Sequence, residues 1–503
     1  MTGSSAPYLL IAGLCLVAVV ALYFFNNPMK HGRWFMMRRF INWFPLGMTY
    51  AFLYMGRYNL VVAKNALGDT MPKEAFGIIF AAGTVTYAAS FLFNGPLVDK
   101  IGGKRGILIA ALGSAFANVV LGVLTYFVVT HQLGMNQVVA FSVIYAINMY
   151  FQSFGAVSII KVKAYWFHVR ERGVFGAIFG TLISFGVYFA FDWGQTVVDL
   201  TKAAPGASGW LRSGLQTLFA ARNRTTDAIW AVFYVPAAIL VCWSLLDWWL
   251  IKDTPEEAGF PPFDTCDASS GQMGVNLSAK ELLGKVFGSS LMLLFAGVAL
   301  TAGVLRNGIM QWYAVFAHEM PRMGAEFYTV HWGFLLCMFG IVGSFVGGLI
   351  SDKVYQSRRG PPAALFCGFM FVMTIVMTAW LFSSPIVVAW AALLIVLAVT
   401  GVHSLMSGTA APDFGGRKAA ATCSGLIDGC VYLGSGLQSI AIGYLAGLSW
   451  IWWPIFLAPF ALIGMFVALR FWNELPPATR KYIAEVELKQ ATELSSPREA
   501  AKA

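Results

Sequence analysis

One polar stretch divides this chain, at residues 252–272, which read KDTPEEAGFPPFDTCDASSGQ. Apolar runs of the length needed to cross a bilayer, about 20 residues, lie on both sides of it. Six runs precede the stretch, near 41–66, 75–98, 106–130, 137–160, 174–198 and 228–251. Six follow it, near 286–316, 328–350, 361–383, 385–408, 418–446 and 449–472, and one more run leads the chain near 8–26. The proline, glycine and acidic residues of the stretch are typical of a linker. Two six-helix halves are therefore predicted, as in many secondary transporters.

The composition agrees with an all-α integral membrane protein. Of the 503 residues, 58% are hydrophobic and only 12% are charged, about half of the charge that soluble proteins carry. We expect an extra transmembrane helix and basic connector at 1–40, a first half at 41–251, a linker at 252–285, a second half at 286–473 and a tail at 474–503. The seven cysteines form no CxxC pair, so neither a metal site nor a disulfide framework is expected. No cofactor is expected.

The basic residues orient these spans. If the segment 27–40 is cytoplasmic, 25 lysines and arginines fall in cytoplasmic segments and seven fall outside, the asymmetry expected of a multi-pass protein of the cell membrane. This bias explains the net charge of +10 without a nucleic-acid partner. The first segment, MTGSSAPYLL, has no basic residue before its apolar run, which favours a retained helix over a cleaved signal peptide. The N-terminus is then outside and the C-terminus cytoplasmic.

Two arginines remain, each deep in an apolar run. Arg57 lies in YAFLYMGRYNLVV and Arg306 in ALTAGVLRNGIMQWYAVF, the first span of each half. An arginine at mid-membrane costs roughly 2.5–3.5 kcal/mol on insertion scales and is tolerated beside a wet cavity or an anion. Symmetric halves would bring the two spans face to face, where two guanidinium forks make a clamp for phosphate or carboxylate. The alternative is that each arginine pairs with a buried acid or reaches an interface.

Polar and aromatic neighbours of both arginines predict a binding pocket. These are Tyr54, Tyr58 and Asn59 around Arg57, and Asn307, Gln311 and Trp312 around Arg306. Such a lining suits a hydroxylated organic body attached to an anion. Taken singly, each of these residues could equally be a packing residue or face lipid.

Two charged loops occupy corresponding positions in the halves. The first reads Gly95-Pro-Leu-Val-Asp99-Lys100-Ile-Gly102-Gly103-Lys104-Arg105, and the second runs from Gly348 through Asp352 and Lys353 to Arg358. An acid beside bases at a helix end can hold a neighbouring helix or charge, so these loops predict conformational control; the alternative is a solvated charge cluster. The first loop resembles the signature of the major facilitator superfamily, which implies a fold of twelve transmembrane helices in two six-helix halves, here with one extra helix.

Further stretches resemble the organophosphate:phosphate antiporter family of glycerol-phosphate and sugar-phosphate carriers. They are Arg57-Tyr58-Asn59, KDTPEEAGFPPF, LRNGIMQW, WFHVRERG, SDKVYQSRRG and DFGGRKAAATCSGLIDG. The resemblance implies a phosphate-binding arginine from each half, at Arg57 and Arg306. This chain departs from the family by having Tyr58, Phe91 and Ile183 where some members carry basic residues. This departure favours a less charged anion, another coupling mode or a sensor role.

We therefore predict a secondary active transporter, a monomer in the bilayer, that exchanges an organic phosphate ester for inorganic phosphate by alternating access. One alternative is a proton-coupled symporter or efflux carrier of another anion, in which Asp428 or His403 carries the proton. The other is a non-transporting sugar-phosphate sensor. The chain contains no Walker A loop and no identifiable nucleophile and base, so an enzyme is not expected.

Overall fold

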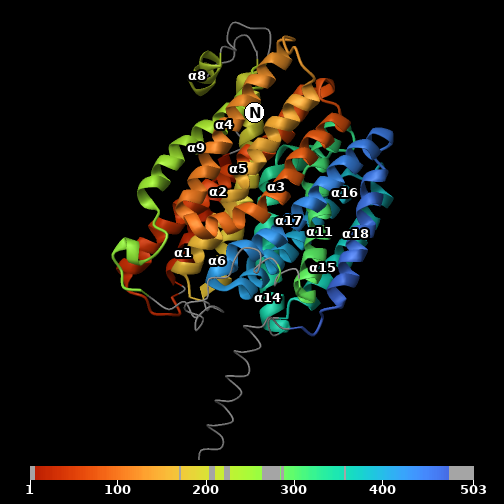
Figure 1. Ribbon diagram of the computed structural model, residues 1–503. Coiled ribbons are helices and arrows are strands. Elements are labelled where there is room, and N and C mark those ends of the chain that lie inside the picture. Colours follow the sequence, from red (N-terminus) through yellow and green to blue (C-terminus); the bar gives the residue numbers. More distant parts are fainter. Residues whose placement is uncertain are drawn as a thin grey trace, which may run out of the picture.

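The computed structural model describes residues 6–25, 27–168, 171–202, 210–219, 227–262, 284, 288–355 and 358–474. These residues form a bundle of long helices and contain no strand (Figure 1). All of the predicted tail at 474–503 except its first residue, and most of the predicted linker at 252–285, lie outside the described residues.

The first half follows a leading helix, α1 (Ala6–Phe25). Its helices are α2 (Arg33–Leu67), α3 (Lys73–Ile101), α4 (Gly103–Val129), α5 (Gln137–Trp166), α6 (Arg172–Tyr188), α7 (Gly194–Thr201), α8 (Trp210–Leu218) and α9 (Ala231–Leu250). The π-helical turn η3 (Phe189–Trp193) joins α6 to α7 into one continuous span. A short 3-10 turn, η1 (Gly68–Thr70), directly follows α2, and a second one, η4 (Glu256–Ala258), lies in the segment after α9.

The second half repeats the arrangement. Its helices are α11 (Ser290–Met310), α12 (Trp312–Glu319), α13 (Glu326–Val330), α14 (Trp332–Leu349), α15 (Gly360–Trp380), α16 (Pro385–His403), α17 (Ala411–Leu448) and α18 (Trp452–Leu469). Two π-helical turns, η5 (Ile350–Val354) and η6 (Ser404–Ala410), extend α14 and connect α16 to α17.

The predicted all-α membrane fold is confirmed. The described part of the chain contains ten helices that are long and apolar enough to span a membrane. Helix α2 is not among these ten; it is long, but five cations along it lower its hydropathy. The other remaining span is α6–η3–α7, which the π turn divides. Both fall at predicted spans, and the apolar part of α1, Leu10–Phe25, precedes all twelve.

Several helix boundaries differ from the predicted spans. Helix α2 begins at Arg33 rather than at 41, and α17 begins at Ala411 rather than at 418. Hydropathy detects the part of a helix that lies in hydrocarbon, whereas the backbone hydrogen bonds continue into the charged flank. The predicted run 286–316 is broken at Gln311, between α11 and α12.

The two halves meet along two seams. One is formed by α3 and α17, which lie side by side (Figure 1). Gly77 permits this approach, because a Cβ there would collide with the carbonyl oxygen of Ser439; small residues allow membrane helices to pack closely. The other seam is formed by α6 and α14, where Gly340 leaves room for the hydroxyl of Ser184.

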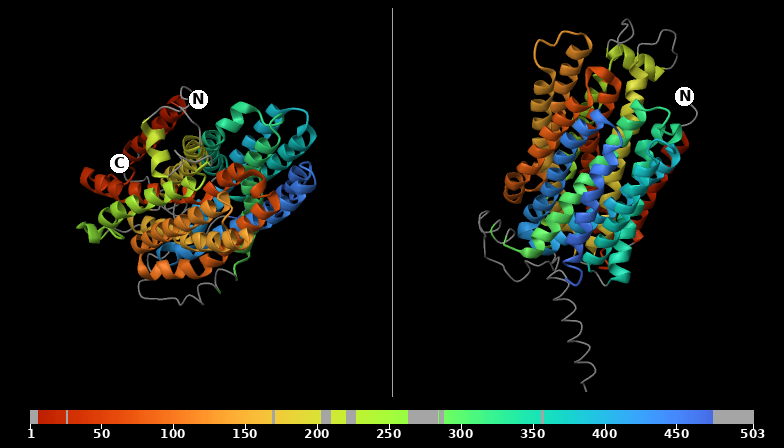
Figure 2. Two further views of the ribbon diagram at one scale, coloured as in Figure 1. Left: turned by 90° about the horizontal axis from the view of Figure 1, so that it is seen from above. Right: turned by 90° about the vertical axis from the view of Figure 1, so that its right-hand side faces the viewer.

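The two ends of the bundle carry different segments. The linker face is the end that carries residues 27–32, Gly102 and 251–262, and the far face is the end that carries Met71, Glu319 and His331. Helix α1 lies at the edge of the bundle (Figure 2) and begins at the far face.

Candidate anion-binding site

The two arginines predicted from the sequence are both buried and converge on one side chain. Arg57 on α2 is 0% exposed and Arg306 on α11 is 3% exposed. Their guanidinium carbons lie 4.6 and 5.8 Å from the centroid of the same Tyr54 ring, and Arg306 Nη2 donates to the Tyr54 hydroxyl at 3.3 Å. One cation from each half therefore reaches the same place in the middle of the bundle.

Each of the three side-chain nitrogens of Arg57 donates a hydrogen bond to a neutral partner. Its Nε donates to Gln152 Oε1 at 2.9 Å, its Nη2 donates to the Tyr87 hydroxyl at 3.1 Å, and its Nη1 donates to the Tyr432 hydroxyl. The guanidinium also lies over the rings of Tyr87 and Tyr432, at 4.5 and 5.1 Å. Tyr432 belongs to the second half, so Arg57 is a contact between the halves.

An amide network fixes the position of the Gln152 side chain. Gln152 Nε2 donates to Ser114 Oγ at 3.1 Å and to Asn148 Oδ1 at 3.2 Å. Asn148 Nδ2 in turn donates to the carbonyl oxygen of Gly56 at 3.0 Å, the residue before Arg57. Buried networks in which every member has a partner are rigid, so α4 and α5 hold the first arginine in place.

Arg306 has side-chain N–H groups that form no hydrogen bond. Its Nε and Nη1 are buried and have no hydrogen-bond partner, and among the described residues neither Arg306 nor Arg57 forms an ion pair. A buried guanidinium with unused N–H groups is costly unless a ligand or water satisfies it. The arrangement can accept the oxygens of a small anion between two forks.

The other predicted pocket residues take different positions. The Tyr58 hydroxyl donates to Asn307 Oδ1 at 2.8 Å, across the two halves, and Asn307 Nδ2 donates to the Ser435 hydroxyl. Gln311 Nε2 reaches Asn307 Oδ1 at 3.4 Å, and Trp312 Nε1 donates to Gln438 at 3.0 Å. Asn59 is not brought to the arginines, because its amide donates to Asn118 on α4 at 2.8 Å.

The two predicted coupling residues lie near η6. Asp428 on α17 is buried and accepts a hydrogen bond from the Ser407 hydroxyl at 2.6 Å. It lies one helical turn before Tyr432, on the same side of α17. His403 ends α16, and its Nδ1 is buried without a hydrogen-bond partner.

Sequence reasoning missed Tyr87 and Tyr432, the two hydroxyls on Arg57. The sequence does not distinguish a tyrosine that packs in an apolar span from one that binds a polar partner, since its ring is suited to both roles. The one available signal was the spacing of Tyr432 from Asp428, which places both on one face of a helix.

The first charged loop is built around a glycine. Gly102 has a φ of +92°, which glycine adopts without strain, and a Cβ there would collide with the carboxylate of Asp253. Asp253 accepts from the backbone N–H of Lys104 at 2.7 Å, at the start of α4. Burial raises the pKa of Asp253, although this backbone hydrogen bond opposes the rise.

The charged side chains of the two loops differ in environment. Asp99 lies 3.0 Å from Lys161 Nζ on α5, whereas Lys100, Arg105 and Lys353 are exposed. In the second loop Arg359 Nη1 donates to Ser351 Oγ at 2.6 Å, and that hydroxyl donates to the carbonyl oxygen of Arg358. The side chain of Asp352 lies outside the described residues.

The halves are also joined at the far face. Glu319 on α12 accepts from Lys64 at 3.0 Å and from Lys73 at 2.8 Å, both of the first half. The Asp192 carboxylate in η3 accepts the backbone N–H groups of Gly333 and Phe334 at 2.9 and 3.1 Å. These N–H groups begin α14, where an anion is stabilised by the helix dipole.

Comparison with known proteins identifies the family of this chain. Residues 46–439 match the Major Facilitator Superfamily. A glycerol-3-phosphate transporter of Bacillus subtilis is 25% identical over 78% of this chain and 82% of its own length. The membrane sensor protein UhpC of Salmonella typhimurium is 24% identical over 86% and 90%. A probable hexose phosphate transport protein of Chlamydia trachomatis is 22% identical over 90% and 94%.

These relatives confirm the predicted resemblance to the organophosphate:phosphate antiporter family. The matched family and relatives are not enzymes, in agreement with the prediction. Among the described residues, no cluster of three or more histidine, cysteine, aspartate or glutamate side chains is arranged to hold a metal ion.

Proposed function

This chain belongs to the major facilitator superfamily, and we propose that it is a secondary active transporter of an organic phosphate ester. Glycerol phosphate or a sugar phosphate is the substrate, and inorganic phosphate is the exchanged anion. The observation that carries this proposal is the pair of buried arginines, one from each half, that meet at Tyr54. The relatives named for transport of glycerol-3-phosphate and hexose phosphate support the substrate class.

The charges suggest why exchange would be obligatory. Arg57 and Arg306 repel each other in the empty site, and a phosphate between them replaces this repulsion with charge-assisted hydrogen bonds. Passage between states with the site open to one side or the other is then easier with an anion bound. Phosphate returning through the same site supplies the driving gradient.

The proposal includes an orientation. The linker face is cytoplasmic and the far face is external, because cytoplasmic segments carry most of the lysines and arginines. The protein is a monomer in the cell membrane, with its N-terminus outside and its C-terminus inside. In this orientation, the contacts that Glu319 and Asp192 make between the two halves hold the external side closed.

A proteoliposome exchange assay tests this function. Vesicles loaded with labelled phosphate are mixed with a panel of glycerol and sugar phosphates, and release of label is followed with and without a pH gradient. We expect release only with an organophosphate outside, and loss of release in Arg57→Ala and Arg306→Ala but not in Arg322→Ala, which changes an exposed arginine. Full-rate release in both buried variants would overturn the proposal, and release that follows the pH gradient would favour proton coupling.

A sensor is the second candidate function. It is favoured by the relative named as a membrane sensor, and by Tyr58, whose position is basic in typical carriers. In the same vesicles a sensor would bind the organophosphate through Arg306 and release no label. Equilibrium binding measured beside the exchange assay separates these two outcomes.

A further inference from the structure

Helix α1 uses one face to contact the bundle. Tyr8, Ala12, Leu16, Val19 and Tyr23 recur at helical spacing and are buried or partly buried against the core. On the opposite face Leu10, Leu14 and Val17 are 65, 59 and 64% exposed. Helix α1 is thus an apolar helix added to the outside of the twelve, with one defined contact stripe.

At the far face this stripe contacts the second half. The Tyr8 ring lies 4.0 Å from the His331 ring and 5.0 Å from the Phe334 ring, centroid to centroid. His331 and Phe334 lie at the start of α14, where the Asp192 carboxylate of the first half also binds.

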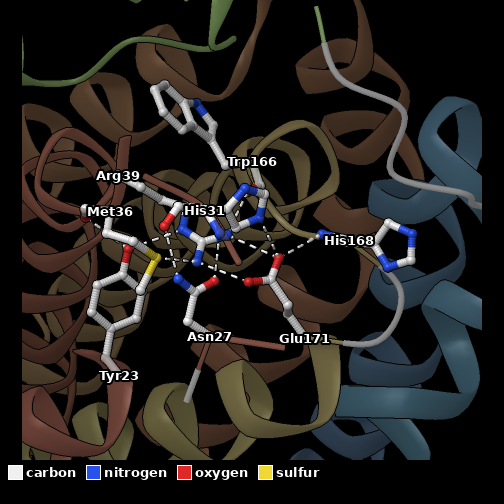
Figure 3. Close-up of polar contacts among 8 residues, drawn as sticks. All are labelled: Tyr23, Asn27, His31, Met36, Arg39, Trp166, His168 and Glu171. Atoms are coloured by element: carbon white, nitrogen blue, oxygen red, sulfur yellow. Dashed lines mark hydrogen bonds and ion pairs between the residues drawn. The ribbon is translucent and has the colours of Figure 1, made fainter. Parts of the chain in front are cut away.

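At the linker face the stripe contacts the first half. The Tyr23 hydroxyl donates to the carbonyl oxygen of Met36 at 2.8 Å and accepts from Arg39 Nε at 2.9 Å (Figure 3). Arg39 in turn forms two hydrogen bonds of 2.9 Å with the carboxylate of Glu171, and both side chains are almost completely buried. Bidentate pairs of this kind are rigid as well as strong.

The surroundings of Glu171 make this anchor firm. Its carboxylate also accepts the backbone N–H of His168 at 3.1 Å and lies 3.5 Å from His31 Nε2 (Figure 3). Burial alone would raise the pKa of Glu171, but the hydrogen bonds from His31 and Arg39 lower it to about 2. The carboxylate is therefore charged at physiological pH, and α1, α2 and the α5–α6 junction are joined at one point.

Between its two ends α1 lies against α6, one side of the α6–α14 seam between the halves. We propose that α1 is a strap across this seam, fixed to the first half at the linker face and to the second half at the far face. Opening of the far face would move the start of α14 away from the first half. The strap resists that movement, so it stabilises the state in which the far face is closed.

This inference rests on the proposed function only in that the two halves move relative to each other. It assigns α1 a role in setting the balance between the two states rather than in binding substrate. Loss of one aromatic pair, such as Tyr8 with His331, corresponds to about a two- to tenfold change in an equilibrium.

Amide hydrogen exchange of the full-length protein in nanodiscs, without substrate, tests the strap. The peptide covering residues 64–75 reports on far-face opening, because it carries Lys64 and Lys73 of the Glu319 contact. We expect its amides to exchange about two- to tenfold faster in Tyr8→Ala. Tyr23→Phe, which removes the hydroxyl at the other anchor, should have a similar effect. Leu10→Ala, on the exposed face of α1, is the matched control and should exchange at the wild-type rate.

The double variant gives a sharper criterion. A strap stabilises the closed state only while both of its ends are attached. The double variant Tyr8→Ala/Tyr23→Phe should therefore exchange no faster than the faster single variant, whereas the effects of two independent stabilising contacts would add. Additive effects, or wild-type exchange at 64–75 in both single variants, would overturn the strap. Because this readout needs no substrate, a positive result stands even if the exchange assay finds no organophosphate, and a negative result leaves the exchange assay unaffected.

Discussion

At the scale of single residues, the two arginines are not equivalent. Arg57 has a partner on each nitrogen, whereas Arg306 has one hydrogen bond and two unpartnered nitrogens. An arriving anion can bind Arg306 through two nitrogens that have no partner, whereas at Arg57 each nitrogen already donates one hydrogen bond, and only the second N–H of Nη1 and of Nη2 is left. We infer that Arg306 contributes the first contacts and that Arg57 completes the site.

This asymmetry leads to a prediction for Arg306→Lys. The variant keeps the charge but loses the planar fork, so the two parallel hydrogen bonds of fixed geometry that a guanidinium makes to two phosphate oxygens are lost. Each charge-assisted bond contributes about 1.5–3 kcal/mol, and we expect phosphate affinity to fall roughly 10- to 100-fold. Equilibrium binding of labelled phosphate to purified protein measures this. Arg322→Lys is the matched control, and equal affinity in both variants would contradict the fork.

At the scale of elements, several helix ends depend on single carboxylates from distant segments. Asp253 holds the start of α4, Asp192 holds the start of α14, and Glu171 joins α2 to the α5–α6 junction. Each carboxylate meets backbone N–H groups or an arginine at a place where a helix must begin or turn.

The anchor at Glu171 should give the protein an acid-sensitive stability. Its pKa falls from an ordinary 4.5 to about 2, so its stabilisation is present above pH 4.5 and is lost as the pH falls towards 2. A shift of that size corresponds to roughly 3 kcal/mol. In thermal unfolding followed by tryptophan fluorescence, Glu171→Gln should unfold at a lower temperature near neutral pH. Below pH 4.5 its unfolding temperature should fall less than that of the wild type.

Asp199→Asn serves as the comparison for this pH series. Asp199 forms an exposed ion pair with Lys202, and such pairs contribute little. If the pH profiles of Glu171→Gln and the wild type were parallel, the carboxylate would not be the acid-sensitive group.

Gly102 gives a second prediction at this scale. Gly102→Ala places a methyl group against Asp253 and a side chain at a φ of +92°, a combination that costs about 1–3 kcal/mol. We expect a lower unfolding temperature, and a smaller loss from the same glycine substitution in an Asp253→Ala background, where the collision is absent but the backbone strain remains. Gly134→Ala, where a Cβ meets open space, is the control; no loss of stability in Gly102→Ala would contradict the predicted strain.

At the scale of the whole molecule, ion pairs join the two halves at the far face. Lys64 is almost fully buried and depends on Glu319, so Glu319→Gln leaves a buried ammonium without its counter-ion. Since Glu319 is 26% exposed, we expect a loss of about 1–2 kcal/mol rather than the full value of a buried pair. The population with the far face open should rise about five- to thirtyfold.

Distances between spin labels at Gln132 and Ser383, one in each half at the far face, measure that population. The labels are placed in a variant whose native cysteines are replaced. Glu326→Gln, an exposed acid at the same face, should leave the distances unchanged. An unchanged distribution in Glu319→Gln would show that this ion pair does not hold the halves together.

Much of this architecture could be predicted from sequence because the membrane simplifies the problem. Apolar runs mark the spans, and the arginines at 57 and 306 stand out because charge in hydrocarbon is rare. The partners of these arginines could not be predicted, since a tyrosine such as Tyr432 is common in any span. The contact of Asp253 with the start of α4 and the docking of α1 depend on folding of distant segments, which local patterns do not encode.

The most direct test of the central claim is stoichiometric binding of labelled phosphate to the purified protein and its arginine variants. The account predicts one saturable site in the wild type, displaced by glycerol or sugar phosphates, and no measurable binding in either Arg57→Ala or Arg306→Ala, with both variants still folded. Undiminished binding in either variant would contradict a site shared by the two halves.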